Sequence, residues 1–387
     1  MKKKIAILGS TGSIGECLLK IVDKDKKKFD IVLLTANKNY KKLFYQTQKF
    51  NVRNVIIKDF VSYKKFKKIN KIKNLNIYND FNNLNKIFKK KIDYTMSSIT
   101  GIDGLEPTFN IIKFTKTIAI ANKESIICAW NLIKKQLNKY KTKFIPVDSE
   151  HFSIWYALKD INIDEISKIY LTASGGPLLN ISKKKIKNVK IKEVLKHPNW
   201  RMGKKITVDS STMMNKVFEI IEAKNIFNVD LKKLSILIHP KSYLHALIVF
   251  NNGMIKLIAH DTTMEIPIFN SLYVNKANFF RKTNLNIKNL NNLNLSQVDI
   301  NKFNSIKLLK LIPKKISLFE TVLVSANDHL VRSYLKKQIN YQNLIDKLDK
   351  ILKLKEFVNL KKVSPKKITD IINLDEYVRL KINSKSV

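Results

Sequence analysis

The fold is decided near the start of the chain, where residues 4–15 read KIAILGSTGSIG. Residues 4–8 form an apolar run typical of a buried strand, glycines follow at positions 9, 12 and 15, and a helical pattern covers residues 14–22. A strand, a glycine turn and a helix in this order predict that the turn binds the pyrophosphate of a dinucleotide at the helix N-terminus. The spacing is Gly-x-x-Gly-x-x-Gly, so a tight turn without a ligand is the alternative interpretation.

The following residues continue the strand–helix alternation. Apolar strand-like runs lie at residues 30–34, 54–57, 93–96 and 117–120, with amphipathic segments between them. This alternation predicts an α/β fold with a parallel, doubly wound, Rossmann-like sheet.

The rest of the chain differs in character. From about residue 147, short motifs rich in Gly, Pro, Asp, Ser and His replace the alternation. Residues 282–304 are rich in asparagine and are predicted to be a linker, whereas the apolar spacing after them predicts helices. We therefore expect domains at 1–147, 148–281 and 305–387, joined by a linker at 282–304.

The net charge of +42 in 387 residues raises a basic nucleic-acid-binding protein as an alternative. Only five of the 73 basic residues are arginine, the residue that base recognition favours, and the lysines are scattered. We attribute the charge to solvated faces of a protein from an A+T-rich, reduced bacterial genome, and expect neither nucleic acid nor membrane as a partner. The two cysteines, Cys17 and Cys128, exclude a disulfide scaffold. A strand at the very start leaves no room for a signal peptide, so we expect a cytoplasmic protein.

The residues after the second predicted strand bear on the choice of dinucleotide. An NAD enzyme normally has an acidic residue there for the ribose hydroxyls, but this chain has Asn37, Lys38 and Asn39. Lys38 could meet a 2′-phosphate, which favours NADPH. An ordinary surface lysine is the alternative.

Two carboxylates mark a candidate metal site in the segment PVDSEH, residues 146–151. Asp148 and Glu150 are two apart, so at the end of a strand both would point to one side. Hard oxygen ligands suit Mg²⁺ or Mn²⁺, although at least one further carboxylate is needed. A solvated loop would show the same pattern.

Three later motifs are candidate substrate-binding elements. LTASGGP at 171–177 offers Ser174 and backbone N–H groups to an anion, or is a bare turn. HPNWRMG at 197–203 places Trp200 in a loop, either to close over a ligand or to anchor the loop. Residues 208–223, VDSSTMMNKVFEIIEA, are predicted to form one capped helix with a polar stripe, which could equally be a solvated face.

Taken in order, these motifs resemble the 1-deoxy-D-xylulose 5-phosphate reductoisomerase family. That family converts its namesake sugar phosphate to 2-C-methyl-D-erythritol 4-phosphate in non-mevalonate isoprenoid synthesis. HPNWRMG and VDSSTMMNKVFE carry most of the resemblance, and ANKES at 121–125, IHPKS at 238–242 with His245, and SAND at 325–328 extend it. It implies a homodimer whose chain has an NADPH domain, an α+β connective catalytic domain and a C-terminal helical domain.

The resemblance also implies roles for individual residues. The metal ligands would be Asp148, Glu150 and Glu219, which with Lys123 form the catalytic set. The substrate would contact Lys123, Ser149, Glu150, Ser174, His197, Trp200, Ser210, Asn215, Lys216 and Glu219. NADPH would contact Thr11, Gly12, Ser13, Ile14, Asn37, Lys38, Asn39, Asn122, Glu124 and Gly203.

The implied reaction is a metal-assisted retro-aldol and aldol rearrangement, followed by reduction with NADPH. Whether Lys123 transfers a proton or only binds substrate stays open. Asn37 stands where the family usually has glycine, and asparagine is tolerated there if the position has a positive φ. The rival enzyme is another NADP- and metal-dependent oxidoreductase that acts on a different phosphorylated substrate.

Overall fold

The computed structural model describes residues 1–186, 188–200, 202–273 and 287–384. Contacts divide the chain into two compact units. The first comprises Met1–Ser125, Ile133–Asp148 and Met264–Phe280, and the second comprises Ile126–Leu132, Ser149–Thr263 and Arg281–Val387. One of the passages of the chain between them lies after Asp148, one residue beyond the expected boundary at 147. The four-part division drawn from the sequence stays a prediction.

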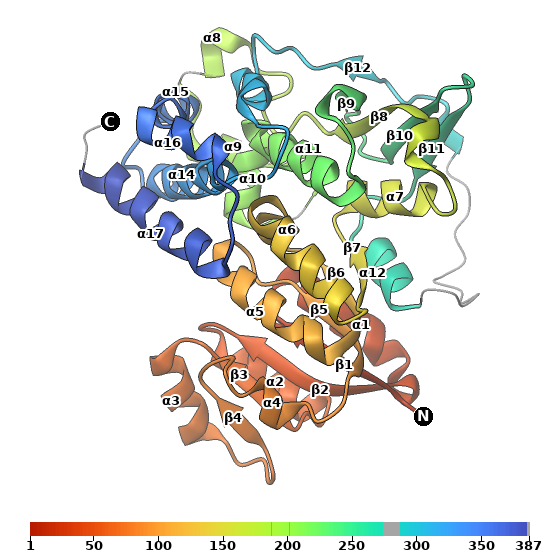
Figure 1. Cartoon of the computed structure of the whole chain (residues 1–387), viewed down its shortest axis with the longest axis vertical. Helices are drawn as coiled ribbons and strands as arrows, with labels where there is room; N and C mark the ends of the chain where they lie inside the picture. The colour runs from red at the N-terminus through yellow and green to blue at the C-terminus, as the bar shows by residue number, and fades with distance from the viewer. Residues whose placement is uncertain (187, 201, 274–286, 385–387) are drawn as a thin grey trace. The chain divides into compact units, whose positions relative to one another are not determined.

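The first unit contains a seven-stranded sheet in the order β4-β3-β2-β1-β5-β6-β7, and every neighbouring pair of strands is parallel (Figure 1). The strands are β1 (Lys3–Leu8), β2 (Phe29–Ala36), β3 (Asn54–Ile57), β4 (Asn76–Tyr78), β5 (Ile92–Ser97), β6 (Thr115–Ile120) and β7 (Lys143–Pro146). The predicted α/β class and parallel sheet are confirmed. The strand order reverses direction between β1 and β5, which is where open sheets of this kind bind ligands.

The helices of the first unit are α1 (Ser13–Lys24), α2 (Tyr40–Lys49), α3 (Phe60–Ile69), α4 (Leu84–Ile87), α5 (Leu105–Ile111), the ends of α6 (Lys123–Lys139) and α12 (Glu265–Leu272), with 3₁₀ turns η1 (Lys26–Lys28), η2 (Ile102–Gly104) and η3 (Ile112–Phe114). Leu18 and Val22 of α1 are one turn apart and pack into the core beside the buried strand residues Ile5 and Ile7. Ile268 of α12 joins the same core from a distant part of the sequence.

The second unit contains a mixed sheet in the order β11-β10-β8-β9-β12, in which β8 and β9 are parallel and the other pairs antiparallel. Its strands are β8 (Ile166–Ala173), β9 (Leu234–Ile238), β10 (Leu244–Phe250), β11 (Ile255–Ala259) and β12 (Ser296–Gln297). Helices α7 (Ser149–Ala157) and α11 (Met214–Phe227) contribute Ile154 and Ile220 to one core with β8 and β10. This shared core holds the first turns of the two helices in fixed positions on one sheet.

The remaining elements of this unit are mostly helical. They are α8 (Lys183–Ile186), α9 (Ile191–Val194), α10 (Lys204–Ser211), α13 (Ile287–Leu290), α14 (Leu318–Leu335), α15 (Tyr341–Leu352), α16 (Lys355–Asn359), α17 (Ile368–Ser384) and the 3₁₀ segments η4 (Ile163–Glu165), η5 (Leu231–Lys233), η6 (Asn304–Leu311) and η7 (Leu360–Lys362). The helices predicted after residue 305 are therefore present.

The asparagine-rich stretch at 282–304 is not a bare linker over its described part. Residues 282–286 lie outside the described ranges, but Ser296 and Gln297 pair with Leu237 and Ile238 of β9, and Phe303 enters a small core. Backbone pairing at a sheet edge needs no apolar side chains, which is why composition concealed it.

Within the described ranges, no helix is both long and apolar enough to cross a membrane.

Gly15 offers a test of the packing beneath the glycine turn. A Cβ atom at Gly15 would lie 2.6 Å from both the Gly9 carbonyl oxygen and the Ser10 Cα. We therefore expect Gly15→Ala to lower the free energy of unfolding by about 1–3 kcal/mol, as overpacking does. Urea titration measures this. Gly12→Ala is the matched control in the same turn because its Cβ would meet nothing closer than 3.4 Å, and equal losses in both variants would contradict the packing argument.

Candidate active site

The loop after β1 has the features of a phosphate-binding turn. Gly9 adopts φ +83°, a conformation that L-residues rarely reach, and Gly12 precedes the first turn of α1. Thr35 at the end of β2 accepts the Gly9 N–H through its hydroxyl at 2.8 Å and so braces the loop. Gly12 and Ser13 are exposed, and no described side chain caps α1, so its first N–H groups are available to an anion. Thr11 and Ile14 are half-buried beside them.

The turn after β2 carries Asn37, Lys38 and Asn39, all exposed. Because β1 and β2 are parallel neighbours, this turn and the glycine loop share one edge of the sheet. Asn39 caps α2 by accepting the Lys42 N–H at 3.3 Å, and the Ser62 hydroxyl donates to the Lys38 carbonyl at 3.1 Å. The φ of Asn37 is not positive. The turn therefore needs no glycine here.

The start of α6 lies at the same sheet edge, after β6. The Asn122 side chain accepts the Ser125 N–H at 2.6 Å and donates to the Gly101 carbonyl at 2.8 Å, so it holds the helix N-terminus against the loop that follows β5. Lys123 and Glu124 are both buried. The Lys123 ammonium lies 3.1 Å from Asp148 Oδ2, so the predicted catalytic lysine contacts a predicted metal ligand.

Asp148 and Glu150 are placed differently from our prediction. β7 ends at Pro146, and Glu150 lies in the first turn of α7, so a helix rather than an alternating strand presents it. The Ser149 hydroxyl donates to Glu150 Oε2 at 2.6 Å.

Lys216 joins Glu150 to Glu219. Its ammonium lies 2.7 Å from Glu150 Oε1 and also donates to Glu219 Oε2, while the Asn215 amide donates to the other Glu219 oxygen. Asn215 and Glu219 are one helical turn apart, as predicted, but Lys216 and Glu219 are buried. The alternative of a solvated helix face is wrong.

The described residues include a carboxylate group that can hold a metal ion. Asp148, Glu150 and Glu219 each offer one oxygen, and these oxygens lie within 4.8 Å of one another. Asp148 is only two residues before Glu150, so chain continuity keeps it near the pair. Three carboxylates are hard oxygen ligands that fit Mg²⁺ or Mn²⁺ and leave positions for water or substrate oxygens.

Residues 208–223 do not form the single helix that we predicted. α10 ends at Ser211, and α11 begins at Met214 after Met213 adopts a left-handed conformation with φ 62°. Ser210 therefore lies at the end of one helix, whereas Asn215 and Lys216 lie in the first turn of the next. The apolar periodicity hid the break because Met213 and Met214 are both buried on either side of it.

Several predicted phosphate-binding residues lie around this break. The His197 Nε2–H donates to the Ser174 hydroxyl at 3.1 Å, and that hydroxyl accepts the Gly176 N–H at 3.1 Å. A Cβ on Gly176 would be 2.5 Å from the Ser210 carbonyl oxygen, so the Ser174 turn packs directly on the end of α10. Burial, together with the positive charge of Lys216, lowers the pKa of His197 to about 4.

His197 also supports the loop that carries Trp200. Its Nδ1 accepts the backbone N–H groups of Asn199 at 3.2 Å and Trp200 at 3.0 Å, which requires a neutral ring protonated at Nε2. The Asn199 amide donates to the Ser242 hydroxyl at 2.9 Å. The half-buried Trp200 presents its ring edge-on to His245, with centroids 6.4 Å apart. Arg201 lies outside the described residues, and Gly203 directly precedes α10.

Sequence reasoning missed a buried pair, His151 and Glu222, next to the acidic residues in the chain. The fully buried His151 has Nδ1 3.5 Å from Glu222 Oε2, and its Nε2–H donates to the Glu219 carbonyl at 2.9 Å. The available signal was the three-residue spacing of Glu219 and Glu222, which places both on one helix face. The pair fixes the backbone of the residue that we predict to bind metal.

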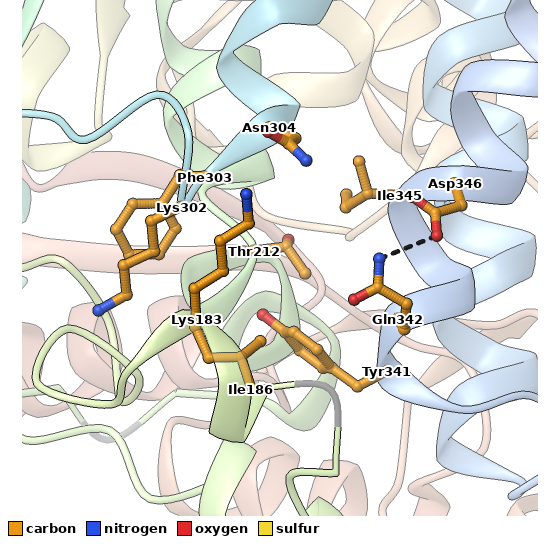
Figure 2. Close-up of a pocket in the computed structure, with 10 residues that line it drawn as sticks. All are labelled: Lys183, Ile186, Thr212, Lys302, Phe303, Asn304, Tyr341, Gln342, Ile345 and Asp346. Atoms are coloured by element: carbon orange, nitrogen blue, oxygen red, sulfur yellow. Dashed lines mark hydrogen bonds between the residues drawn. The ribbon is translucent and has the colours of Figure 1, made fainter.

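A pocket in the second unit contains none of the predicted site residues, although Thr212 of the break between α10 and α11 lines it (Figure 2). It is lined by Lys183, Ile186, Thr212, Lys302, Phe303, Asn304, Tyr341, Gln342, Ile345 and Asp346.

The depressed pKa of His197 has a measurable consequence. The unfolded chain binds a proton near the ordinary value of 6.5, whereas the folded protein resists it until about pH 4. The stabilising contribution of this residue is therefore present above pH 6.5 and is lost as the pH falls toward 4. We expect the free energy of unfolding, measured by urea titration, to fall less for His197→Gln than for the wild type when the pH is lowered from 6.5 to 4. Parallel pH profiles would contradict a neutral, half-buried imidazole at His197.

Comparison with known families gives three matches that together cover most of the chain. Residues 5–130 match the model of 1-deoxy-D-xylulose 5-phosphate reductoisomerase, residues 144–227 match the C-terminal domain model of the same enzyme, and residues 261–381 match the DXP reductoisomerase C-terminal domain.

Curated relatives carry the same name. A 1-deoxy-D-xylulose 5-phosphate reductoisomerase from Pelagibacter ubique is 58% identical over 387 residues, covering 100% of both chains. The enzyme of that name from Clostridium novyi is 35% identical, covering 99% of each.

Solved structures agree over the whole length. The reductoisomerase from Zymomonas mobilis in complex with NADPH superposes with a TM-score of 0.87 at 27% identity and covers 100% of each chain. A DOX-P reductoisomerase in complex with NADPH, fosmidomycin and magnesium gives a TM-score of 0.90 at 28% identity, covering 99% of this chain and 98% of that one.

Proposed function

Because this chain belongs to the 1-deoxy-D-xylulose 5-phosphate reductoisomerase family, we propose that it performs that reaction with the residues described above. It converts 1-deoxy-D-xylulose 5-phosphate to 2-C-methyl-D-erythritol 4-phosphate, using NADPH and a divalent metal. The observation that carries the proposal for the site is the convergence of Asp148, Glu150 and Glu219 around one point.

The first unit binds the dinucleotide. NADPH supplies the hydride that reduces the rearranged aldehyde. The N–H groups of Thr11, Ser13 and Ile14 take the pyrophosphate at the start of α1, where Gly12, whose own N–H donates to the Gly9 carbonyl at 3.1 Å, lets the backbone approach it, and Lys38 neutralises the 2′-phosphate. Asn37 and Asn39 lie beside Lys38, whereas Asn122 and Glu124 lie after β6 on the same sheet edge. Gly203 remains a predicted contact from the second unit.

The acidic residues hold the metal. Bound there, Mg²⁺ or Mn²⁺ acts as a Lewis acid toward the substrate oxygens during rearrangement of the carbon skeleton. Glu150 and Glu219 keep their geometry because α7 and α11 pack on one sheet, and Ser149 and Asn215 each donate to one of the two carboxylates. The Lys123 ammonium, 3.1 Å from Asp148, lies where it can hold a substrate hydroxyl or supply a proton.

The phosphate of the substrate binds at the break between α10 and α11. Lys216 supplies charge, Asn215 at the start of α11 and Ser174 supply polar groups, and Ser210 closes the other side. His197 stays neutral near pH 7, so its Nε2–H can pass from the Ser174 hydroxyl to a phosphate oxygen when substrate binds, while its Nδ1 keeps the base of the Trp200 loop in place. Phosphate binding and the Trp200 loop are thereby linked through one imidazole ring.

Two further proposals concern the protein in the cell. The structure has no disulfide between Cys17 and Cys128, and Cys128 is buried, which suits a reducing, cytoplasmic setting. We also propose a homodimer, following the resemblance. Light scattering tests it, and a monomer at assay concentration would contradict it.

The function is tested by NADPH oxidation with 1-deoxy-D-xylulose 5-phosphate. We expect turnover with Mg²⁺ or Mn²⁺ and none after chelation, with activity restored when metal is returned. Mass spectrometry and NMR should identify the branched tetrol phosphate as the product. A different product, or turnover only with another phosphorylated substrate, would support the rival oxidoreductase.

The metal assignment is tested by Glu219→Gln, which keeps the shape but removes the charge. Loss even of an outer partner of a metal ligand costs about 10–100-fold, so we expect the loss of turnover here to exceed about a hundredfold. NADPH binding, measured by fluorescence, should not change. Glu376→Gln, an exposed position on α17, is the matched control. Full activity of Glu219→Gln would remove this residue from the metal site.

A further inference from the structure

The bulge in β10 gives His245 an unusual position. The ladder pairs Leu244 with Ala259 and then Ala246 with Ile258, so His245 is the extra residue between two consecutive pairs. Bulges of this kind re-aim a side chain out of the regular alternation. His260 directly follows β11, where its N–H donates to the Tyr243 carbonyl at 3.0 Å. The bulge and this pairing bring the two histidine rings together.

The two imidazole rings are stacked. Their centroids are 3.7 Å apart, and their planes differ by 17°. The His245 Nε2–H donates to the His260 carbonyl at 3.2 Å, and the His260 Nδ1–H donates to the Asp261 carbonyl at 2.8 Å. Each ring therefore has one N–H held by a backbone oxygen, which fixes its orientation. Burial lowers the pKa of His260, which keeps its ring neutral in the stack.

The stack supports the loop that carries Trp200. The Trp200 ring meets His245 edge-on at 70°, on a residue that is otherwise buried. His197 and Asn199 hold the base of the loop through hydrogen bonds. Among the described rings, only His245 faces the indole of Trp200. A residue that fixes the plane of the His245 ring therefore also fixes the surface against which the Trp200 ring packs.

We propose that His260 is a positioning residue that acts through His245 to hold Trp200 in place over the bound sugar phosphate. The proposal rests on the proposed function for its effect on catalysis, but the contact chain from His260 to His245 to Trp200 lies wholly within the second unit. His260 contributes no hydrogen bond to the predicted site residues in the described structure. Its contribution is the flat face that it presents to His245.

Two substitutions separate the stack from the hydrogen bond. His260→Phe keeps an aromatic face but cannot donate to Asp261, whereas His260→Asn keeps a donor near the Nδ1 position but has no ring. A ring contact of this kind corresponds to about a two- to tenfold change in an equilibrium constant. We expect His260→Asn to raise KM for 1-deoxy-D-xylulose 5-phosphate by about that factor with KM for NADPH unchanged, and His260→Phe to restore it.

The matched control is Tyr377→Leu. It removes a ring contact between α16 and α17, with Phe357 at 6.3 Å, and the hydroxyl that donates to Glu356, in the same unit. It should lower the midpoint of thermal unfolding without changing either KM. An equal rise in KM for the sugar phosphate in the control would show a general structural effect and overturn the proposal.

A readout without turnover keeps this proposal separate from the proposed function. The chain has three tryptophans, so protein labelled with 5-fluorotryptophan should give three ¹⁹F resonances, and Trp200→Phe assigns one of them. We expect His260→Asn to shift or broaden the Trp200 resonance and His260→Phe to leave it near the wild-type position. If the wild-type protein fails to turn over the sugar phosphate, the comparison of the Trp200 resonance in the two variants alone decides whether His260 positions Trp200.

Two results would overturn the proposal. The first is a Trp200 resonance in His260→Asn that matches the wild type. The second is an equal shift or broadening of the Trp200 resonance in His260→Phe and His260→Asn, which would assign the effect to the hydrogen bond with Asp261. If His260→Asn does not fold, His260→Met removes the ring at similar volume and is measured in its place with the same expectation.

Discussion

The arrangement of the site depends on a buried cation between two carboxylates. Lys216 contacts Glu150 and Glu219, and all three come from helices that pack on the same sheet. Removing one member of such a buried pair strands the other charge, which typically costs about 3–5 kcal/mol. The two glutamates therefore remain close because the ammonium makes their proximity tolerable, and their proximity is what creates a metal-binding group with Asp148.

The break between α10 and α11 brings further site residues together. A continuous helix would place Ser210 and Lys216 nearly two turns apart along one axis. The left-handed residue Met213 ends α10 and starts α11, so the end of one helix and the beginning of the next come together. The Ser174 turn reaches this point because Gly176 leaves room for the Ser210 carbonyl. His197 then connects the same point to the Trp200 loop through its second nitrogen.

The sequence predicted most of the first unit because its signals are local. Buried parallel strands such as residues 54–57 are short apolar runs, and the glycines at 9 and 15 are required by backbone geometry alone. The motifs also indicated which second-unit residues would meet, although their local structure was predicted less well. Glu150 was placed on a strand rather than a helix, and Met213 was placed inside one helix, because apolar periodicity does not register a single left-handed residue. The His245–His260 stack had no sequence signal, since it arises from a one-residue bulge.

The charge of the chain is best understood from where its lysines lie. Among the described residues, only Lys123, Lys216 and Lys224 are buried, and each lies against a carboxylate: Asp148, then Glu150 and Glu219, then Glu320. The other described lysines retain access to water, where a positive charge costs little and substitution toward lysine meets no structural resistance. Each buried lysine ammonium contacts a carboxylate, and replacing that acidic residue would leave the ammonium buried without a partner. The excess charge therefore accumulates on the surface, while the acidic residues on which the proposed chemistry depends, Asp148, Glu150 and Glu219, each contact a buried lysine.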